Sequence, residues 1–169
     1  THANRNGPLF EECVKFAKRG GFIDLTGSED AEFWEEQDGE VRVSKAVKRL
    51  MEEGVPLENF GLSSDAQGSL PIFNEKKEFV GLGVGKATCL IKEIKDCVLK
   101  EGIDLSVILG AVTANPARIL NLKEKGRIAG GMDADLCLLD AKTLDIDTVI
   151  AKGRTMVEGG MPVVRGTFQ

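Results

Sequence analysis

The sequence contains no tyrosine, and its only histidine is the second residue, His2. A catalytic zinc site usually takes about three protein ligands and leaves one position open, and imidazole is the usual choice. One histidine cannot supply such a set. If the protein uses a catalytic metal, we therefore expect further ligands from sequence outside these 169 residues.

Long hydrophobic runs and a net positive charge are also lacking. No stretch of 18 apolar residues could form a membrane-spanning helix, and no signal peptide is recognisable. The net charge is -5, which gives no reason to expect a nucleic acid or an anionic membrane as a partner. With 42% apolar and 29% charged residues, the composition is that of a globular domain with a core of its own.

No Cys-x-x-Cys pair occurs among the four cysteines, which are Cys13, Cys89, Cys97 and Cys137. Each lies among apolar neighbours. This predicts buried free thiols in a reducing compartment, and therefore a cytoplasmic protein.

Hydrophobic spacing and glycine positions predict two kinds of organisation. Strand and helix units come first, and a unit rich in short strands follows, with a boundary near Leu122. The predicted domains are thus residues 1–122 and 123–169. Helices are expected at 6–19, 42–53, 86–100, 105–112 and 115–120, strands at 22–25, 60–62, 136–139, 149–151, 154–157 and 161–164, and a hairpin at 71–80.

Two stretches have no clear chemistry. Residues 29–40 hold seven acids and no bases, which is typical of a solvated loop, although Phe33 and Trp34 leave a lid or a subunit contact open. The glycine-rich segment 81–86 fits neither a phosphate loop nor a dinucleotide fingerprint. We interpret it as a flexible lead into the next helix.

Residues 61–69 are the stretch around which the chain is organised. Leu62 can pack inward and Asp65 follows where the strand ends, which in alternating strand and helix barrels is the end that carries active groups. Taken alone, Ser-Ser-Asp is more often a helix cap or an Asx-turn. His2 lies one strand and helix unit earlier, also at an expected strand end. The aspartates Asp133 and Asp135 suit turn hydrogen bonds better than a metal.

Several motifs together resemble the carboxyl-terminal half of the isoaspartyl dipeptidase family in the amidohydrolase superfamily. They are Thr-His-Ala-Asn-Arg-Asn at 1–6 with Pro-Leu-Phe at 8–10, Gly-Gly-Phe-Ile-Asp-Leu-Thr at 20–26, and Leu-Ser-Ser-Asp-Ala-Gln-Gly-Ser-Leu-Pro at 62–71. The segments 113–117 and 126–136 are similar to motifs found throughout the superfamily. The resemblance covers essentially the whole chain.

The resemblance implies the carboxyl-terminal part of a (β/α)8 TIM-like barrel, with strands 6–8 and their helices, followed by strands of a small β-sandwich. It also implies a binuclear zinc site. His2 would bind one zinc, and Asp65 would bind the other and shuttle the proton. Arg5 would hold a substrate carboxylate and Ser69 would contact the substrate. The other metal ligands and a catalytic tyrosine of the family would precede Thr1.

The resemblance implies hydrolysis of the β-aspartyl bond in dipeptides by a metal-activated hydroxide. A zinc pair can supply that hydroxide at neutral pH, because it lowers the pKa of bound water to about 7. The expected partners are an isoaspartyl dipeptide, the amino-terminal half of the protein and further copies in a homo-oligomer. Two alternatives stay open. One is another amidohydrolase acting on a cyclic amide or an N-acyl amino acid, and the other is an inactive fragment or assembly module. A barrel of this kind takes about 250 residues, so we expect this chain to be a part.

Overall fold

The structure is a computed structural model that describes residues 1–28, 31, 34–35 and 39–166. It divides the chain into two units, Thr1–Val112 and Thr113–Gln169. The first unit ends before the predicted boundary at Leu122, and the assignment of residues 1–122 and 123–169 to separate domains stays a prediction. Most of the acidic run at 29–40 lies outside the described residues, and so does Phe33.

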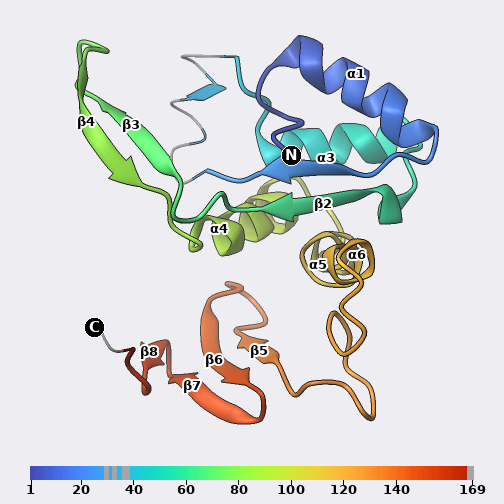
Figure 1. The fold of residues 1–169 in the computed structure, drawn as a ribbon, viewed down its shortest axis with the longest axis vertical. Coiled ribbons are helices and arrows are strands. Elements are labelled where there is room, and N and C mark those ends of the chain that lie inside the picture. Colours follow the sequence, from blue (N-terminus) through green and yellow to red (C-terminus); the bar gives the residue numbers. More distant parts are fainter. Residues whose placement is uncertain (29–30, 32–33, 36–38, 167–169) are drawn as a thin grey trace. The chain divides into compact units, whose positions relative to one another are not determined.

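Two parallel strands run through the first unit, β1 (Ile23–Thr26) and β2 (Phe60–Ser63). Their register pairs Ile23 with Phe60 and Thr26 with Ser63, so both strands end side by side. Parallel neighbours need a crossover, and the connection between them contains a helix. The predicted strand and helix succession is therefore confirmed in this part of the chain (Figure 1).

Helix α1 (Gly7–Lys18) begins where the sequence predicts. The side chain of Asn6 accepts a hydrogen bond from the Leu9 amide at 3.0 Å, as an N-cap residue does. Helix α3 (Val43–Glu52) fills the crossover, and its Leu50 is fully buried. Both helices stop at glycines with positive φ, Gly20 and Gly54, where a side chain would be strained.

A hairpin follows β2 and consists of β3 (Ser69–Phe73) and β4 (Phe79–Val84). Figure 1 shows it extending beyond the carboxyl ends of β1 and β2. The expectation of a flexible lead over residues 81–86 was wrong for 81–84, because these residues pair with β3 in an antiparallel ladder. The ring of Phe73 contacts the rings of Trp34 and Phe79 edge to face, which links the hairpin to residue 34.

The predicted helix over 86–100 is shorter and less regular. Helix α4 (Cys89–Lys95) continues as a π-helical turn (Asp96–Lys100), in which the Glu101 amide donates to the Asp96 carbonyl at 3.2 Å. Helix α5 (Leu105–Val112) then begins after Asp104, whose carboxylate accepts from the Ser106 amide at 2.8 Å. The cap predicted at Asp104 is confirmed.

The second unit holds α6 (Ala114–Ile119) and a four-stranded antiparallel sheet in the order β5 (Leu136–Leu139), β6 (Ile146–Ala151), β7 (Arg154–Glu158) and β8 (Met161–Pro162). The short strands predicted after residue 122 are confirmed. Asp135 accepts from the Lys152 amide at 2.7 Å, and Lys125 contacts both Asp133 and Asp135. These bonds agree with the turn interpretation of the two aspartates.

None of the four cysteines, all in the described part, forms a disulfide. Cys89 and Cys97 are buried as predicted, and burial raises the pKa of the Cys97 thiol to about 12. The prediction was wrong for Cys137, which is exposed on β5, and only partly right for Cys13, which is half-buried. The described residues contain no helix with both the length and the apolar content that a membrane crossing needs.

Candidate active site

The four predicted site residues, His2, Arg5, Asp65 and Ser69, line one cavity of about 480 Å³ in the first unit. His2 and Arg5 come from the segment before α1, Asp65 from the loop after β2, and Ser69 from the start of β3. The structure thus brings together residues that are far apart in the sequence. The role of each of them stays a prediction.

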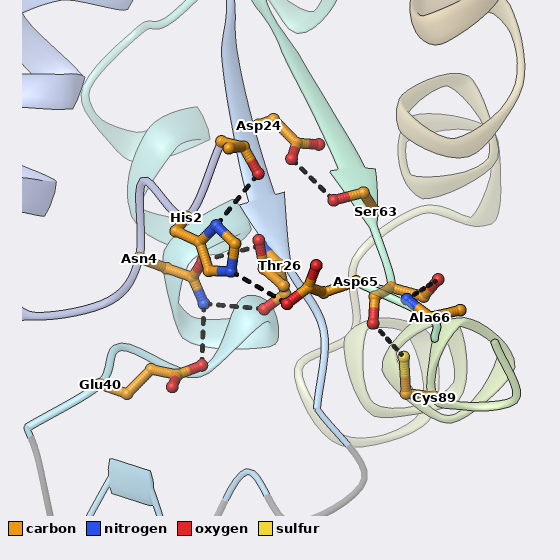
Figure 2. Close-up of polar contacts among 11 residues, drawn as sticks. His2, Asn4, Asp24, Thr26, Glu40, Ser63, Asp65, Ala66 and Cys89 are labelled. Carbon is orange, nitrogen blue, oxygen red and sulfur yellow. Dashed lines mark hydrogen bonds and ion pairs between the residues drawn. The ribbon is translucent and has the colours of Figure 1, made fainter. Parts of the chain in front are cut away.

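The side chains of His2 and Asp65, which both line this cavity, point toward each other (Figure 2). The Nε2 atom of His2 lies 3.4 Å from the Oδ2 atom of Asp65. Both residues have a left-handed backbone, with φ of 56° at His2 and 47° at Asp65. This conformation is uncommon for residues other than glycine, and such strained positions cluster at functional sites.

Two glycines hold the Asp65 loop in place. The amide of Gly85 donates to the Gly68 carbonyl, and the Gly85 carbonyl accepts from the Gln67 amide, both at 2.9 Å. A Cβ atom at Gly85 would lie 2.9 Å from the Asp65 carbonyl oxygen, and one at Gly68 would lie 2.8 Å from it. Only glycine fits either position without displacing Asp65, and the Gly68 amide closes the turn at 3.0 Å from the same oxygen.

Asn4 fastens the segment that carries His2 and Arg5 to the end of β1. Its Oδ1 accepts from the Thr26 amide at 2.8 Å, and its Nδ2 donates to the carbonyls of Thr26 at 3.1 Å and Val41 at 3.0 Å (Figure 2). The Asn4 side chain is almost fully buried. The sequence motif at 1–6 includes Asn4, but no role was predicted for it. The available signal was its side-chain amide, which can donate and accept hydrogen bonds at the same time.

Glu93 of α4 was also missed. Its Oε1 accepts from the amide of Ser28, two residues after the end of β1, at 3.2 Å, and its stem packs against Gly27. Gly27 and Ser28 line the cavity. Burial raises the pKa of the Glu93 carboxyl above its ordinary value. The available signal in the sequence was the position of Glu93, which is an acid among the apolar residues on the buried side of α4.

The donors present in the cavity suit zinc chemically, because it binds imidazole nitrogen and carboxylate oxygen. His2 and Asp65 bring one of each into close proximity. Across the described residues, no group of three or more histidine, cysteine, aspartate or glutamate side chains could hold a metal ion. The two residues therefore fit part of a metal-ligand set and do not complete one.

Comparison with known proteins decides the family. The sequence profile of the amidohydrolase family matches residues 37–156, well over half of the chain. The chain belongs to the amidohydrolase family. Its mixed α/β structure is part of the amidohydrolase fold, and amidohydrolases typically depend on a metal.

Among solved structures, this amidohydrolase chain is similar to the β-aspartyl dipeptidase of Fervidobacterium islandicum AW-1 in complex with a β-Asp-Leu dipeptide. The identity is 37%, the TM-score is 0.80, and the match covers 98% of this chain and 41% of that one. The resemblance to the isoaspartyl dipeptidases is thus shown over nearly the whole chain.

Two curated relatives match either over a short segment or at lower identity. A dihydroorotase of Methanothermobacter thermautotrophicus is 40% identical over 60 residues, 36% of this chain and 14% of the relative. An adenine deaminase of Oceanobacillus iheyensis is 25% identical over 94% of this chain and 30% of its own length. This amidohydrolase chain therefore spans less than half the length of the proteins it matches.

Proposed function

We propose that this chain supplies the carboxyl-terminal half of the active site of a zinc-dependent β-aspartyl dipeptidase. The observation that carries the proposal is the gathering of His2, Arg5, Asp65 and Ser69 around one cavity, in a chain 37% identical to an enzyme solved with β-Asp-Leu. In this account, the amino-terminal half of the protein supplies the remaining ligands, and the complete protein is a cytoplasmic homo-oligomer.

The proposal also assigns the elements to a larger fold. Strands β1 and β2 would be strands 7 and 8 of a (β/α)8 barrel, with His2 at the end of strand 6. The parallel pairing of β1 and β2, with His2 and Asp65 near their carboxyl ends, supports this assignment. Strands β5 to β8 would belong to a small β-sandwich, which the antiparallel order of this sheet supports.

His2 through Nε2 and Asp65 through its carboxylate would hold zinc ions. A zinc pair bound there would supply Lewis acidity that brings the pKa of water near 7 and polarises a carbonyl. Asp65 would accept the proton of the attacking water at a carboxylate oxygen and pass it to the leaving amine. The glycine contacts that fix the Asp65 loop keep this carboxylate aimed into the cavity.

Arg5 and Ser69 would bind the substrate. A guanidinium stays charged at all relevant pH values and can hold a carboxylate by two parallel hydrogen bonds. The Arg5 amide donates to the His2 carbonyl at 3.1 Å, and this turn keeps both residues beside the cavity. The hydroxyl of Ser69 can donate to the substrate from the first residue of β3.

Arg5→Met in the complete protein tests this function, with Arg19→Met at the exposed end of α1 as the control. We expect wild type and R19M to hydrolyse β-Asp-Leu and to lose that activity on metal removal. R5M should lose about a hundredfold or more in kcat/KM, since a charge-assisted bidentate contact is lost. Full activity after metal removal, verified by elemental analysis, would contradict the mechanism.

Hydrolysis of a cyclic amide is the second candidate, because a 60-residue segment is 40% identical to a dihydroorotase. The complete protein would then hydrolyse dihydroorotate faster than β-Asp-Leu. An assembly module without activity would turn over neither kind of substrate in the complete protein.

A further inference from the structure

Glu93 of α4 is a buried acid that the proposed chemistry does not use. The residue is 1% exposed, and burial raises the pKa of its carboxyl above the ordinary value of 4.5. An apolar side chain at this position would avoid the cost of removing a carboxyl from water. The presence of an acid therefore calls for a contact that only a polar side chain can make.

That contact is with the segment that follows β1. The Oε1 atom of Glu93 accepts a hydrogen bond from the Ser28 amide at 3.2 Å. A Cβ atom added at Gly27 would lie 3.0 Å from the Cγ atom of Glu93, so the side chain also packs closely on the backbone there. Both Gly27 and Ser28 line the cavity that holds the candidate site. Glu93 thus contacts a part of the cavity wall.

The same part of the wall is bonded to the strand that leads to Asp65. The Gly27 amide donates to the Ser63 carbonyl at 2.8 Å, at the end of β2. One helical turn before the buried acid, the Sγ atom of Cys89 lies 3.8 Å from the Ser64 carbonyl oxygen (Figure 2). Helix α4 therefore contacts the chain after both strands. Asp65 follows directly, so its position depends on these contacts.

We propose that Glu93 is a positioning residue, whose buried carboxyl holds the segment after β1 on α4 and thereby fixes the position of Asp65 in the cavity. This inference rests on the proposed function, in which Asp65 moves the proton. The Ser28 amide donates, so the contact needs an acceptor oxygen and no charge. Loss of the acceptor should affect the reacting step more than substrate binding, since Arg5 and Ser69 lie on other segments.

Glu93→Met and Glu93→Gln in the complete protein form a matched pair, because both side chains resemble Glu in length and only glutamine keeps an acceptor oxygen. Ile94→Ala is the control, since Ile94 is also buried on α4 but its side chain cannot form a hydrogen bond. Misplacing a reacting group by about 1 Å can cost about a hundredfold. With the Gly27 bond retained, we expect E93M to lower kcat on β-Asp-Leu about tenfold and to leave KM nearly unchanged. E93Q and I94A should keep most of kcat below their melting temperatures.

Amide hydrogen exchange gives a second readout that does not depend on activity. Exchange at residues 27–28 and 63–65 should be faster in E93M than in wild type, and E93Q should restore the protection. Glu93→Asp, which withdraws the acceptor by one methylene group, should have the effects of E93M and replaces it if E93M does not fold.

Three results would overturn the role of Glu93: an unchanged kcat in folded E93M, an equal loss in E93Q, or an equal loss in I94A. Each of them leaves the proposed function standing. If wild type turns over no β-Asp-Leu, the proposed function fails instead. The exchange rates at 27–28 and 63–65 then still decide whether Glu93 holds these two segments.

Discussion

The Nε2 atom of His2 lies 3.4 Å from the Oδ2 atom of Asp65, although one residue precedes α1 and the other follows β2. Each of the two has a left-handed backbone, and each is held by bonds from its own surroundings. The contact therefore depends on two separate anchors, the Asn4 side chain at the end of β1 and the glycine pair around the Asp65 loop.

Gly85→Ala should reduce activity without unfolding the protein. The added methyl group would lie 2.9 Å from the Asp65 carbonyl oxygen, so the loop has to move. Since misplacing a reacting group by about 1 Å can cost a hundredfold, we expect a loss of that order in kcat, measured on β-Asp-Leu. Gly81→Ala is the matched control, because nothing lies within 4 Å of its added methyl group. Equal activity of the two variants would show that the Asp65 loop is not held by Gly85.

Asn4→Ala should destabilise the protein more than Asn6→Ala. The first substitution leaves the buried amide and carbonyl of Thr26 without their partner, which costs about 2–3 kcal/mol. The second removes an exposed helix cap worth about 1 kcal/mol. Urea unfolding of both variants compares these costs. If N6A is the more harmful change, the clamp at the end of β1 is not the dominant anchor of the segment that carries His2.

The Glu93 carboxyl gives stability a defined pH dependence. Burial raises its pKa in the folded protein above the ordinary value of 4.5, so the folded state holds the proton more tightly than the unfolded chain. Its contribution is fully present below the unfolded pKa and is lost as pH rises through the folded pKa. Glu93→Gln keeps an acceptor for the Ser28 amide but cannot ionise. The melting temperature of E93Q minus that of wild type should therefore increase as pH rises from 4 to 8, and parallel curves would contradict a raised pKa at Glu93.

Local signals predicted much of the fold. The Asn6 cap, the positive-φ glycines Gly20 and Gly54, and the apolar strand leading to Asp65 depend on neighbours in the sequence, and the structure agrees with each. The segment 81–84 was misjudged, because its glycines are typical of a loop and its hydrogen-bond partners in β3 are not visible locally. The π-helical turn after α4 likewise depends on a bond from Glu101 back to Asp96, which side-chain spacing does not reveal.

The candidate site was predictable only in part. The residue pattern around Asp65 was compatible with a helix cap, an Asx-turn or an active-site residue. The resemblance to the dipeptidases predicted the roles of His2, Arg5 and Ser69. Asn4 and Glu93 were missed because their roles lie in long-range contacts with Thr26 and Ser28. Such contacts require the packing of α4 and the amino-terminal segment around β1, which no local pattern specifies.

The central claim is that His2, Arg5, Asp65 and Ser69 serve a β-aspartyl dipeptidase. Its most direct test is kcat/KM of the complete, metal-loaded protein on β-Asp-Leu, on the α-linked Asp-Leu and on the cyclic amide dihydroorotate. The account predicts turnover of β-Asp-Leu at least about a hundredfold above the other two, consistent with the discrimination that a buried polar contact can give. Equal or faster hydrolysis of the α-linked peptide or of the cyclic amide would contradict it.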